Sequence, residues 1–219
     1  MYKTEQLFDL DKSIAKEYLS KYEYPWQVLD DISKIIIEIG NKLDQNEYKK
    51  IGDDIWVHKN AKVASSSSIV GPTIICEGAE IRHCAFVRGS ALIDKDCVVG
   101  NSCEIKNSIL LEHAEIPHFN YVGDSILGYK AHMGAGAVTS NLKSDRKNIV
   151  VKDEEERIDI NRRKMGAMIG DNSEIGCNSV LNPGTIIGKN CIVYPTSCVR
   201  GTVKENSIYK NSGVIVVKK

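Results

Sequence analysis

Aliphatic residues recur at every sixth position through most of this chain of 219 residues. A first run extends from Val57 to Leu111, and a second extends from Ile169 to Val199. Small side chains such as Ala79 stand two residues before most of these positions. A helix repeats its buried face about every 3.6 residues and a strand every second residue, so neither explains the pattern. The period therefore indicates a solenoid of stacked repeats.

Six residues accommodate one short strand and one tight turn. Three such units close a triangular coil of about 18 residues, and successive coils stack through hydrogen bonds like those of parallel strands. The aliphatic residue then points inward, and the small residue fits the crowded corner. The period predicts a mainly β protein, a parallel β-helix, and by itself leaves the handedness of the coil open.

The period is interrupted in two places. Near Pro117 the regular spacing fails, and glycines at 123, 128 and 134 follow. Residues 141–166 are rich in charged side chains, which cannot line the interior of a β-helix. We expect this stretch to project as a loop or small hairpin, and such interruptions are common places for function.

The N-terminal part has a different pattern, which divides the chain into a helical segment, 1–50, and a β-helix domain, 51–219. Asp11 is suited to begin a helix that continues to about Tyr22, and Pro25 to begin a second helix that Gly40 ends. We expect this segment to cap the open end of the β-helix. The second helix carries an apolar stripe formed by Trp26, Leu29, Ile32, Ile36 and Ile39.

Composition excludes several classes of function. The 29 basic and 29 acidic residues give a net charge of zero, which argues against partners such as nucleic acid or a membrane surface. No apolar run reaches the roughly 20 residues of a membrane span, and the N-terminus lacks the apolar core of a signal peptide. Cys97, Cys103 and Cys191 occupy small-residue positions, and no Cys-x-x-Cys occurs. We expect a reduced, cytoplasmic protein without disulfides.

Among the five histidines, His118 has the most suggestive neighbours. It lies where the period breaks, and Asn141 and Lys147 follow in the charged loop. An imidazole that titrates near neutral pH, close to amide and ammonium donors, is suited to act as a general base on an amine or hydroxyl.

The central part of the sequence resembles the left-handed β-helix, or hexapeptide-repeat, acyltransferases. It is most similar to the acetyltransferase domain of the bifunctional N-acetylglucosamine-1-phosphate uridyltransferases/glucosamine-1-phosphate acetyltransferases, without their nucleotidyltransferase domain. The family pattern fits without a gap from Arg88 to Lys147, and the repeats extend it over 51–205. The strings that carry the resemblance are Phe-Val-Arg (86–88), Val-Gly-Asn-Ser-Cys-Glu-Ile-Lys (99–106), His-Phe-Asn-Tyr-Val-Gly-Asp (118–124) and Met-Gly-Ala-Gly-Ala-Val-Thr-Ser-Asn (133–141).

The resemblance implies a role for each matching residue. His118 is the catalytic base, and Glu104 supports it. Ala135 makes a backbone contact to the co-substrate acetyl-CoA. The resemblance also implies a homotrimer with sites between subunits. The residues that hold the sugar phosphate are Arg88, Lys106, Tyr121, Asn141 and Lys147.

Elementary chemistry agrees with these roles. Acetyl transfer to an amine requires a base and a donor for the developing oxyanion, and no metal. A phosphate monoester carries up to two negative charges, which arginine and lysine match. The sequence therefore predicts an acetyl-CoA-dependent N-acetyltransferase that acts on an amino-sugar phosphate.

The chain departs from the family at three binding positions. His132 replaces an asparagine that contacts substrate, which leaves the identity of the sugar open. Cys177 and Tyr194 occupy coenzyme A positions where small residues are usual.

Other functions remain open on the sequence. A γ-class carbonic anhydrase on this fold would hold zinc with three histidines from adjacent subunits, and His113 and His118 have the five-residue offset of such sites. However, His83 and His113 are 30 residues apart, which is not a whole number of coils. A non-catalytic regulatory trimer is a second alternative. Sugar-phosphate nucleotidyl transfer is a third, although the sequence contains no glycine-rich phosphate loop.

Overall fold

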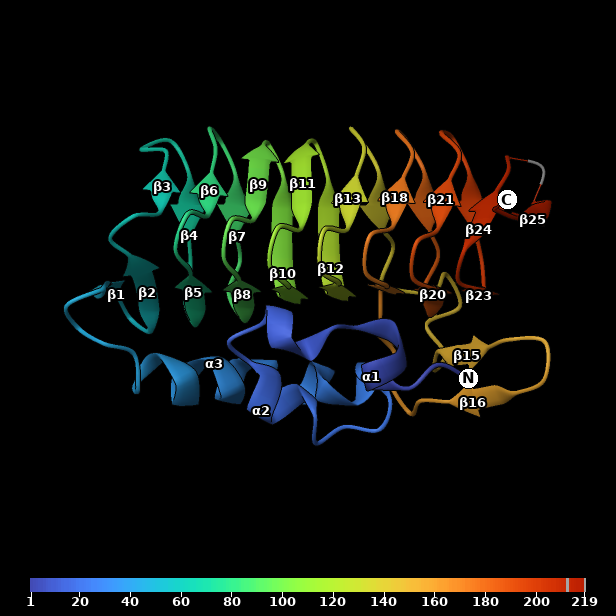
Figure 1. Cartoon of the computed structure of the whole chain (residues 1–219), viewed down its shortest axis with the longest axis horizontal. Helices are drawn as coiled ribbons and strands as arrows, with labels where there is room; N and C mark the ends of the chain where they lie inside the picture. The colour runs from blue at the N-terminus through green and yellow to red at the C-terminus, as the bar shows by residue number, and fades with distance from the viewer. Residues whose placement is uncertain (212, 219) are drawn as a thin grey trace.

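The chain winds into a parallel β-helix with a helical segment along one side (Figure 1). The computed structural model describes residues 1–211 and 213–218. Strands of successive coils pair in parallel along the whole solenoid, and each coil has three faces. The mainly β solenoid that the six-residue period predicts is confirmed.

Each face is named here after one of its strands. The β5 face consists of β2 (Ile55–His58), β5 (Thr73–Ile75), β8 (Ala91–Ile93), the ends of β10 (Glu104–Leu110) and β12 (Tyr121–Leu127), β17 (Ala167–Ile169), β20 (Thr185–Ile187) and β23 (Thr202–Val203). The β11 face consists of β3 (Lys62–Val63), β6 (Glu80–Ile81), β9 (Val98–Asn101), β11 (Glu115–His118), β13 (His132–Met133), β18 (Glu174–Ile175), β21 (Ile192–Val193), β24 (Ser207–Tyr209) and the antiparallel β25 (Ile215–Val217). The β14 face consists of β4 (Ser68–Ile69), β7 (Phe86–Val87), the beginnings of β10 and β12, β14 (Val138–Thr139), β19 (Val180–Leu181) and β22 (Cys198–Val199).

The aliphatic positions form one buried interior column, with one error in the predicted register. Ile75 pairs with Ile93, a step of 18 residues, but Ile93 then pairs with Leu110 and Leu110 with Leu127, steps of 17. The prediction that Leu111 lies in the interior was therefore wrong: Leu110 lies there, and Leu111 is buried against the helices.

One corner explains the shift in register. Three residues separate Val87 from Ala91, whereas only two separate their partners Ile105 and Ser108 in the next coil. The shortened corner turns on Asn107, which has a positive φ of 45°. Asparagine tolerates this left-handed conformation better than most residues.

The helical segment covers the β5 face and does not cap the end of the β-helix. The segment consists of α1 (Thr4–Leu7), η1 (Leu10–Lys12), α2 (Lys16–Leu19), η2 (Pro25–Asp30) and α3 (Ile32–Gly40). These helices run beside the solenoid in Figure 1. The predicted position was wrong because each strand of this face also carries an apolar residue that points outward and must be buried. Those residues are Trp56, Ile74, Leu92, Ile109, Ile126, Met168 and Ile186.

The first predicted helix, from Asp11 to Tyr22, is replaced by the short helices η1 and α2. The side chain of Asp9, not that of Asp11, caps η1. The backbone here follows the flank of the β-helix because two buried carboxylates hold it: Asp171 accepts the Asp9 N–H at 2.7 Å, and Asp94 accepts the Ile14 N–H at 3.0 Å. The second predicted helix begins at Pro25 and ends at Gly40 as expected, although its first half is a 3-10 helix.

The charged stretch forms the predicted hairpin, in which β15 (Val150–Lys152) pairs with β16 (Arg157–Asp159). Ile149 and Val151 are buried in the same apolar cluster as the helices. A further strand, β1 (Tyr48–Gly52), pairs antiparallel with β2. The helices, the hairpin and the β5 face share one hydrophobic cluster. The division into domains 1–50 and 51–219 stays a prediction. Among the described residues, no helix has the length and apolar character to cross a membrane.

Truncation of an outward side chain on the β5 face tests the helical cover. Leu92 is fully buried, so Leu92→Ala should lower the free energy of unfolding by about 2–5 kcal/mol. Val150 lies on the hairpin and is 41% exposed, so Val150→Ala should cost about 0.5 kcal/mol or less. Chemical denaturation measures both values, and equal losses would contradict the burial of Leu92 beneath the helices.

Asp94 should make stability depend on pH in an unusual direction. Burial raises the pKa of its carboxyl group from 3.8 to about 6, because the charged form is desolvated. The folded state therefore favours the protonated form, and this stabilisation is lost as the pH rises through the folded pKa. Between about pH 4 and pH 7 the unfolding free energy of the wild type should fall by up to about 3 kcal/mol relative to Asp94→Asn. A constant difference between the two proteins over this range would contradict the assignment.

Candidate active site

The predicted site residues lie on two adjacent faces, on either side of one corner. The corner after β11 is formed by Phe119, which has a positive φ of 53°, and Asn120. The β11 face and the corner after it carry His118, His132, Ala135, Cys177 and Tyr194, and the β14 face and the corner after it carry Arg88, Glu104, Lys106, Tyr121 and Asn141. Lys147 is exposed on the segment that leads from β14 to the hairpin.

His118 is the last residue of β11, and its position is held through the backbone. Its N–H donates to the side chain of Asn120 at 3.1 Å, and its carbonyl accepts the N–H of Gly136 at 3.0 Å. Asn120 is buried, and its amide group also donates to the carbonyls of Gly134 and Ala137. Asn120 therefore joins the predicted base to the turn that contains Ala135. Asn120 lies within one of the strings that carry the family resemblance, but no sequence pattern indicates this bridging role.

The side chain of Glu104 bonds to Arg88. The Arg88 Nη1 atom lies 2.5 Å from Glu104 Oε1, and the two residues come from neighbouring coils of the β14 face. His118 lies around the corner from this ion pair, and no bond between Glu104 and His118 is found in the described part of the chain. The supporting role of Glu104 therefore stays a prediction.

Two of the five predicted phosphate-binding residues, Lys106 and Asn141, meet at Asp124, for which no role was predicted. The Asn141 Nδ2 atom donates to Asp124 Oδ2 at 2.5 Å, and the Lys106 Nζ atom lies 3.8 Å from the same oxygen. Asp124 itself is almost completely buried. The structure thus brings Lys106 and Asn141 together on one buried carboxylate.

Tyr121 lies beside this cluster with its phenol half-buried. A Cβ atom on Gly123 would lie 2.6 Å from the Tyr121 hydroxyl and 3.0 Å from Asn141 Nδ2, so only glycine leaves room for both groups. Burial, and next the charge of Asp124, raise the pKa of Tyr121. The phenol therefore keeps its proton at neutral pH and can donate a hydrogen bond to an anion.

His132 is also oriented by a carboxylate. Its Nδ1 atom lies 2.7 Å from Glu174 Oε2, on the next coil of the β11 face. The carbonyl of Ala135 accepts the N–H of Asn178, and the side chains of Cys177 and Tyr194 are exposed on later coils of the same face. Among the described residues, no hydrogen bond joins the side chains of His132, Cys177 or Tyr194 to His118.

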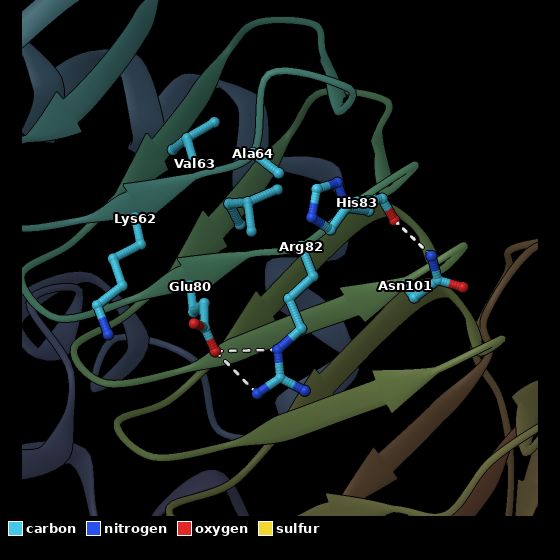
Figure 2. Close-up of a pocket in the computed structure, with 8 residues that line it drawn as sticks. Lys62, Val63, Ala64, Glu80, Arg82, His83 and Asn101 are labelled. Carbon is cyan, nitrogen blue, oxygen red and sulfur yellow. Dashed lines mark hydrogen bonds and ion pairs between the residues drawn. The ribbon is translucent and has the colours of Figure 1, made fainter.

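A groove of about 560 Å³ opens on the β11 face, on the N-terminal side of His118 (Figure 2). Arg82 forms an ion pair with Glu80 along this groove, at 2.8 Å. Asn101 donates to the carbonyl of His83 and is also the register partner of His118. The groove therefore borders the row of residues that contains the predicted base.

The histidines of the described chain do not converge. The His83 ring bonds to Ser66, whereas His113 lies at a different corner with Asp96 and Tyr129. His83 and His113 thus lie at different corners, as their spacing of 30 residues predicts. Among the described residues, no group of three or more His, Cys, Asp or Glu is arranged to hold a metal ion.

Comparison with known families and sequences gives consistent matches. Residues 69–159 match the GMPPB C-terminal domain, and residues 166–201 match the bacterial transferase hexapeptide (six repeats). The bifunctional protein GlmU of Methanococcus maripaludis is 33% identical over 207 residues, covering 92% of this chain and 50% of the relative. A bifunctional sugar-1-phosphate nucleotidylyltransferase/acetyltransferase of Sulfurisphaera tokodaii is 32% identical over 193 residues, covering 85% and 47%. The chain thus spans about half the length of these curated relatives.

Solved structures give weaker matches. A perosamine N-acetyltransferase from Caulobacter crescentus, in complex with CoA and GDP-perosamine, has a TM-score of 0.36 and 16% identity, covering 74% of this chain and 56% of that one. AntD, an N-acyltransferase from Bacillus cereus, has a TM-score of 0.38 and 14% identity, covering 75% and 81%. The repeat, the parallel β-helix and the sequence matches place this chain in the hexapeptide-repeat family, with GlmU-like relatives over most of its length.

Proposed function

We propose that this chain is an acetyl-CoA-dependent N-acetyltransferase whose acceptor is an amino-sugar phosphate. The observation that carries the proposal is that Arg88, Lys106, Tyr121 and Asn141 share the β14 face and the corner after it, while His118 ends the adjacent β11 face. Cationic and hydrogen-bond donor groups on the β14 face suit a phosphate, and the imidazole at the end of the β11 face suits an amine. The relative from Sulfurisphaera tokodaii, named as an acetyltransferase, supports this reaction class.

The proposed reaction is direct transfer. The His118 imidazole accepts a proton from the acceptor amine as the nitrogen attacks the thioester carbonyl of acetyl-CoA. The tetrahedral intermediate collapses when the carbon–sulfur bond breaks, and the thiolate of coenzyme A leaves and takes up a proton. The amine has then become an acetamide. Ala135, Cys177 and Tyr194 lie on the same face as His118, toward the C-terminal coils, and we assign this side to acetyl-CoA.

The acceptor phosphate is assigned to the β14 face. Arg88 and Lys106 supply positive charge there, and Lys147 extends from the exposed segment that follows. The helices and hairpin cover the β5 face and leave the β11 and β14 faces uncovered. Contacts between subunits in the proposed homotrimer therefore involve these two faces, where the site residues also lie.

Removal of the proposed base tests the reaction. His118→Ala should lower kcat for acetyl transfer by about 100-fold or more, because a general base contributes on that scale. The measurement is thiol release from acetyl-CoA against a panel of amino-sugar phosphates. His113→Asn is a matched control, because asparagine occupies the equivalent corner at 172 and 190, and it should keep wild-type activity. Full activity of His118→Ala would remove the base assignment, and no turnover by the wild type with any acceptor would contradict the proposed function.

Lys147 should affect the acceptor and not the donor. Lys147→Ala removes one charge from the proposed phosphate site, so KM for the amino-sugar phosphate should rise about tenfold while KM for acetyl-CoA stays unchanged. Lys152→Ala, on β15 of the hairpin, is the control and should leave both constants unchanged. An unchanged acceptor KM in Lys147→Ala would exclude this residue from the phosphate site.

A further inference from the structure

We propose that Asp124 is the positioning residue that sets the acceptor-binding side chains Lys106 and Asn141 in place. The proposal rests on the proposed function and deepens it, because it names the residue on which recognition of the acceptor depends. It assigns Asp124 no contact with substrate.

Both oxygens of the Asp124 carboxylate are engaged. Oδ1 accepts the Asn107 amide at 2.8 Å, and Oδ2 accepts the Asn141 amide at 2.5 Å with Lys106 Nζ 3.8 Å away. The side chain of Asp124 is only 5% exposed, so a bound phosphate would meet Lys106 and Asn141 rather than the carboxylate. A buried carboxylate is costly unless it is paired and hydrogen-bonded, and here these same partners satisfy it.

The shortened corner brings Asp124 to this position. Asn107 and Asp124 are register neighbours at the corner between the β14 and β5 faces, and both have positive φ values, 45° and 50°. The Asn107 amide also donates to the carbonyl of Leu29 at 3.1 Å, which ties the corner to the helical segment. On its other side, the Asp124 carbonyl accepts the N–H of Gly166 at 2.8 Å, where the chain returns from the hairpin. Asp124 is therefore fixed by the helical segment and by the hairpin insertion.

A carboxylate is needed at position 124 because each of its two oxygens accepts a hydrogen bond from an asparagine amide. In Asp124→Asn, an N–H₂ group replaces one of the two carboxylate oxygens. This donor group would then face the amide donor of either Asn107 or Asn141, and two donors cannot form a hydrogen bond with each other. Asn107 is held by a second acceptor, the Leu29 carbonyl, so Asn141 is the partner that should be displaced. Lys106 loses its counter-charge in the same substitution. The expected effect is therefore on acceptor binding.

Steady-state kinetics with glucosamine-1-phosphate and acetyl-CoA test the proposal. Asp124→Asn should raise KM for the amino-sugar phosphate about tenfold, the scale of one hydrogen bond to a charged group, with kcat and KM for acetyl-CoA within about twofold of wild type. Combining it with Asn141→Ala should give less than the product of the single effects, because Asp124 acts partly through Asn141. A wild-type acceptor KM in folded Asp124→Asn, or fully multiplicative effects, would overturn the proposal.

Asp171→Asn is the matched structural control. Asp171 is an equally buried carboxylate that holds the Asp9 and Tyr129 N–H groups and pairs with Lys189, away from the site. It should lower thermal stability and leave the acceptor KM unchanged. An equal rise in acceptor KM in both variants would overturn the proposal, since it would reflect general destabilisation.

A second variant covers the case in which Asp124→Asn does not fold. Asn107→Ser removes one donor to the carboxylate, and serine already occupies positive φ in this chain at Ser90 and Ser102. It should also raise the acceptor KM, by less than Asp124→Asn, and a wild-type value would overturn the proposal. Failure of the wild type to acetylate glucosamine-1-phosphate or any other amino-sugar phosphate would instead contradict the proposed function.

Discussion

The interior column of aliphatic side chains is the contact on which the rest of the structure depends. Each coil must present its aliphatic residues inward, and a slip of one residue within a strand would turn them outward. Changes in coil length are therefore confined to corners, outside the strands whose aliphatic residues form the column. The 17-residue coils are shortened at the Asn107 and Asp124 corners, and the hairpin is inserted after β14. Lys106 and Asn141, two of the proposed acceptor-binding residues, lie at these same corners, whereas His118 lies at the corner that follows β11.

Coil length also explains which parts of the fold the sequence could predict. The six-residue period predicted the solenoid, and the charge of 141–166 predicted the hairpin. The covered face follows a longer period, from Trp56 to Ile74 and Leu92, and then at a spacing of 17 to Ile109 and Ile126. This second apolar position in every third repeat can be detected in the sequence, but the stronger six-residue pattern obscures it. This is why the helices were expected at the open end.

The candidate site was predicted residue by residue only through family resemblance. Spacing alone could point to His118 as a residue at a break, but not to its neighbours across the corner. Asn120 and Asp124 were missed because each acts by hydrogen bonds to several segments distant in sequence. Asp124, for example, contacts Asn141 and Gly166, on either side of the hairpin. Such roles depend on coil stacking, which no local pattern in one chain encodes.

The covered β5 face and the site are connected through a single corner. Asn107 bonds to the helical segment on one side and to Asp124 on the other, and Asp124 holds Lys106 and Asn141, two of the proposed acceptor-binding side chains. The helical segment thus does more than bury an apolar stripe, because it supplies the acceptor that orients Asn107. Since a buried polar network is strong only when every member is satisfied, the position of the helices and the geometry of the proposed phosphate site are physically coupled.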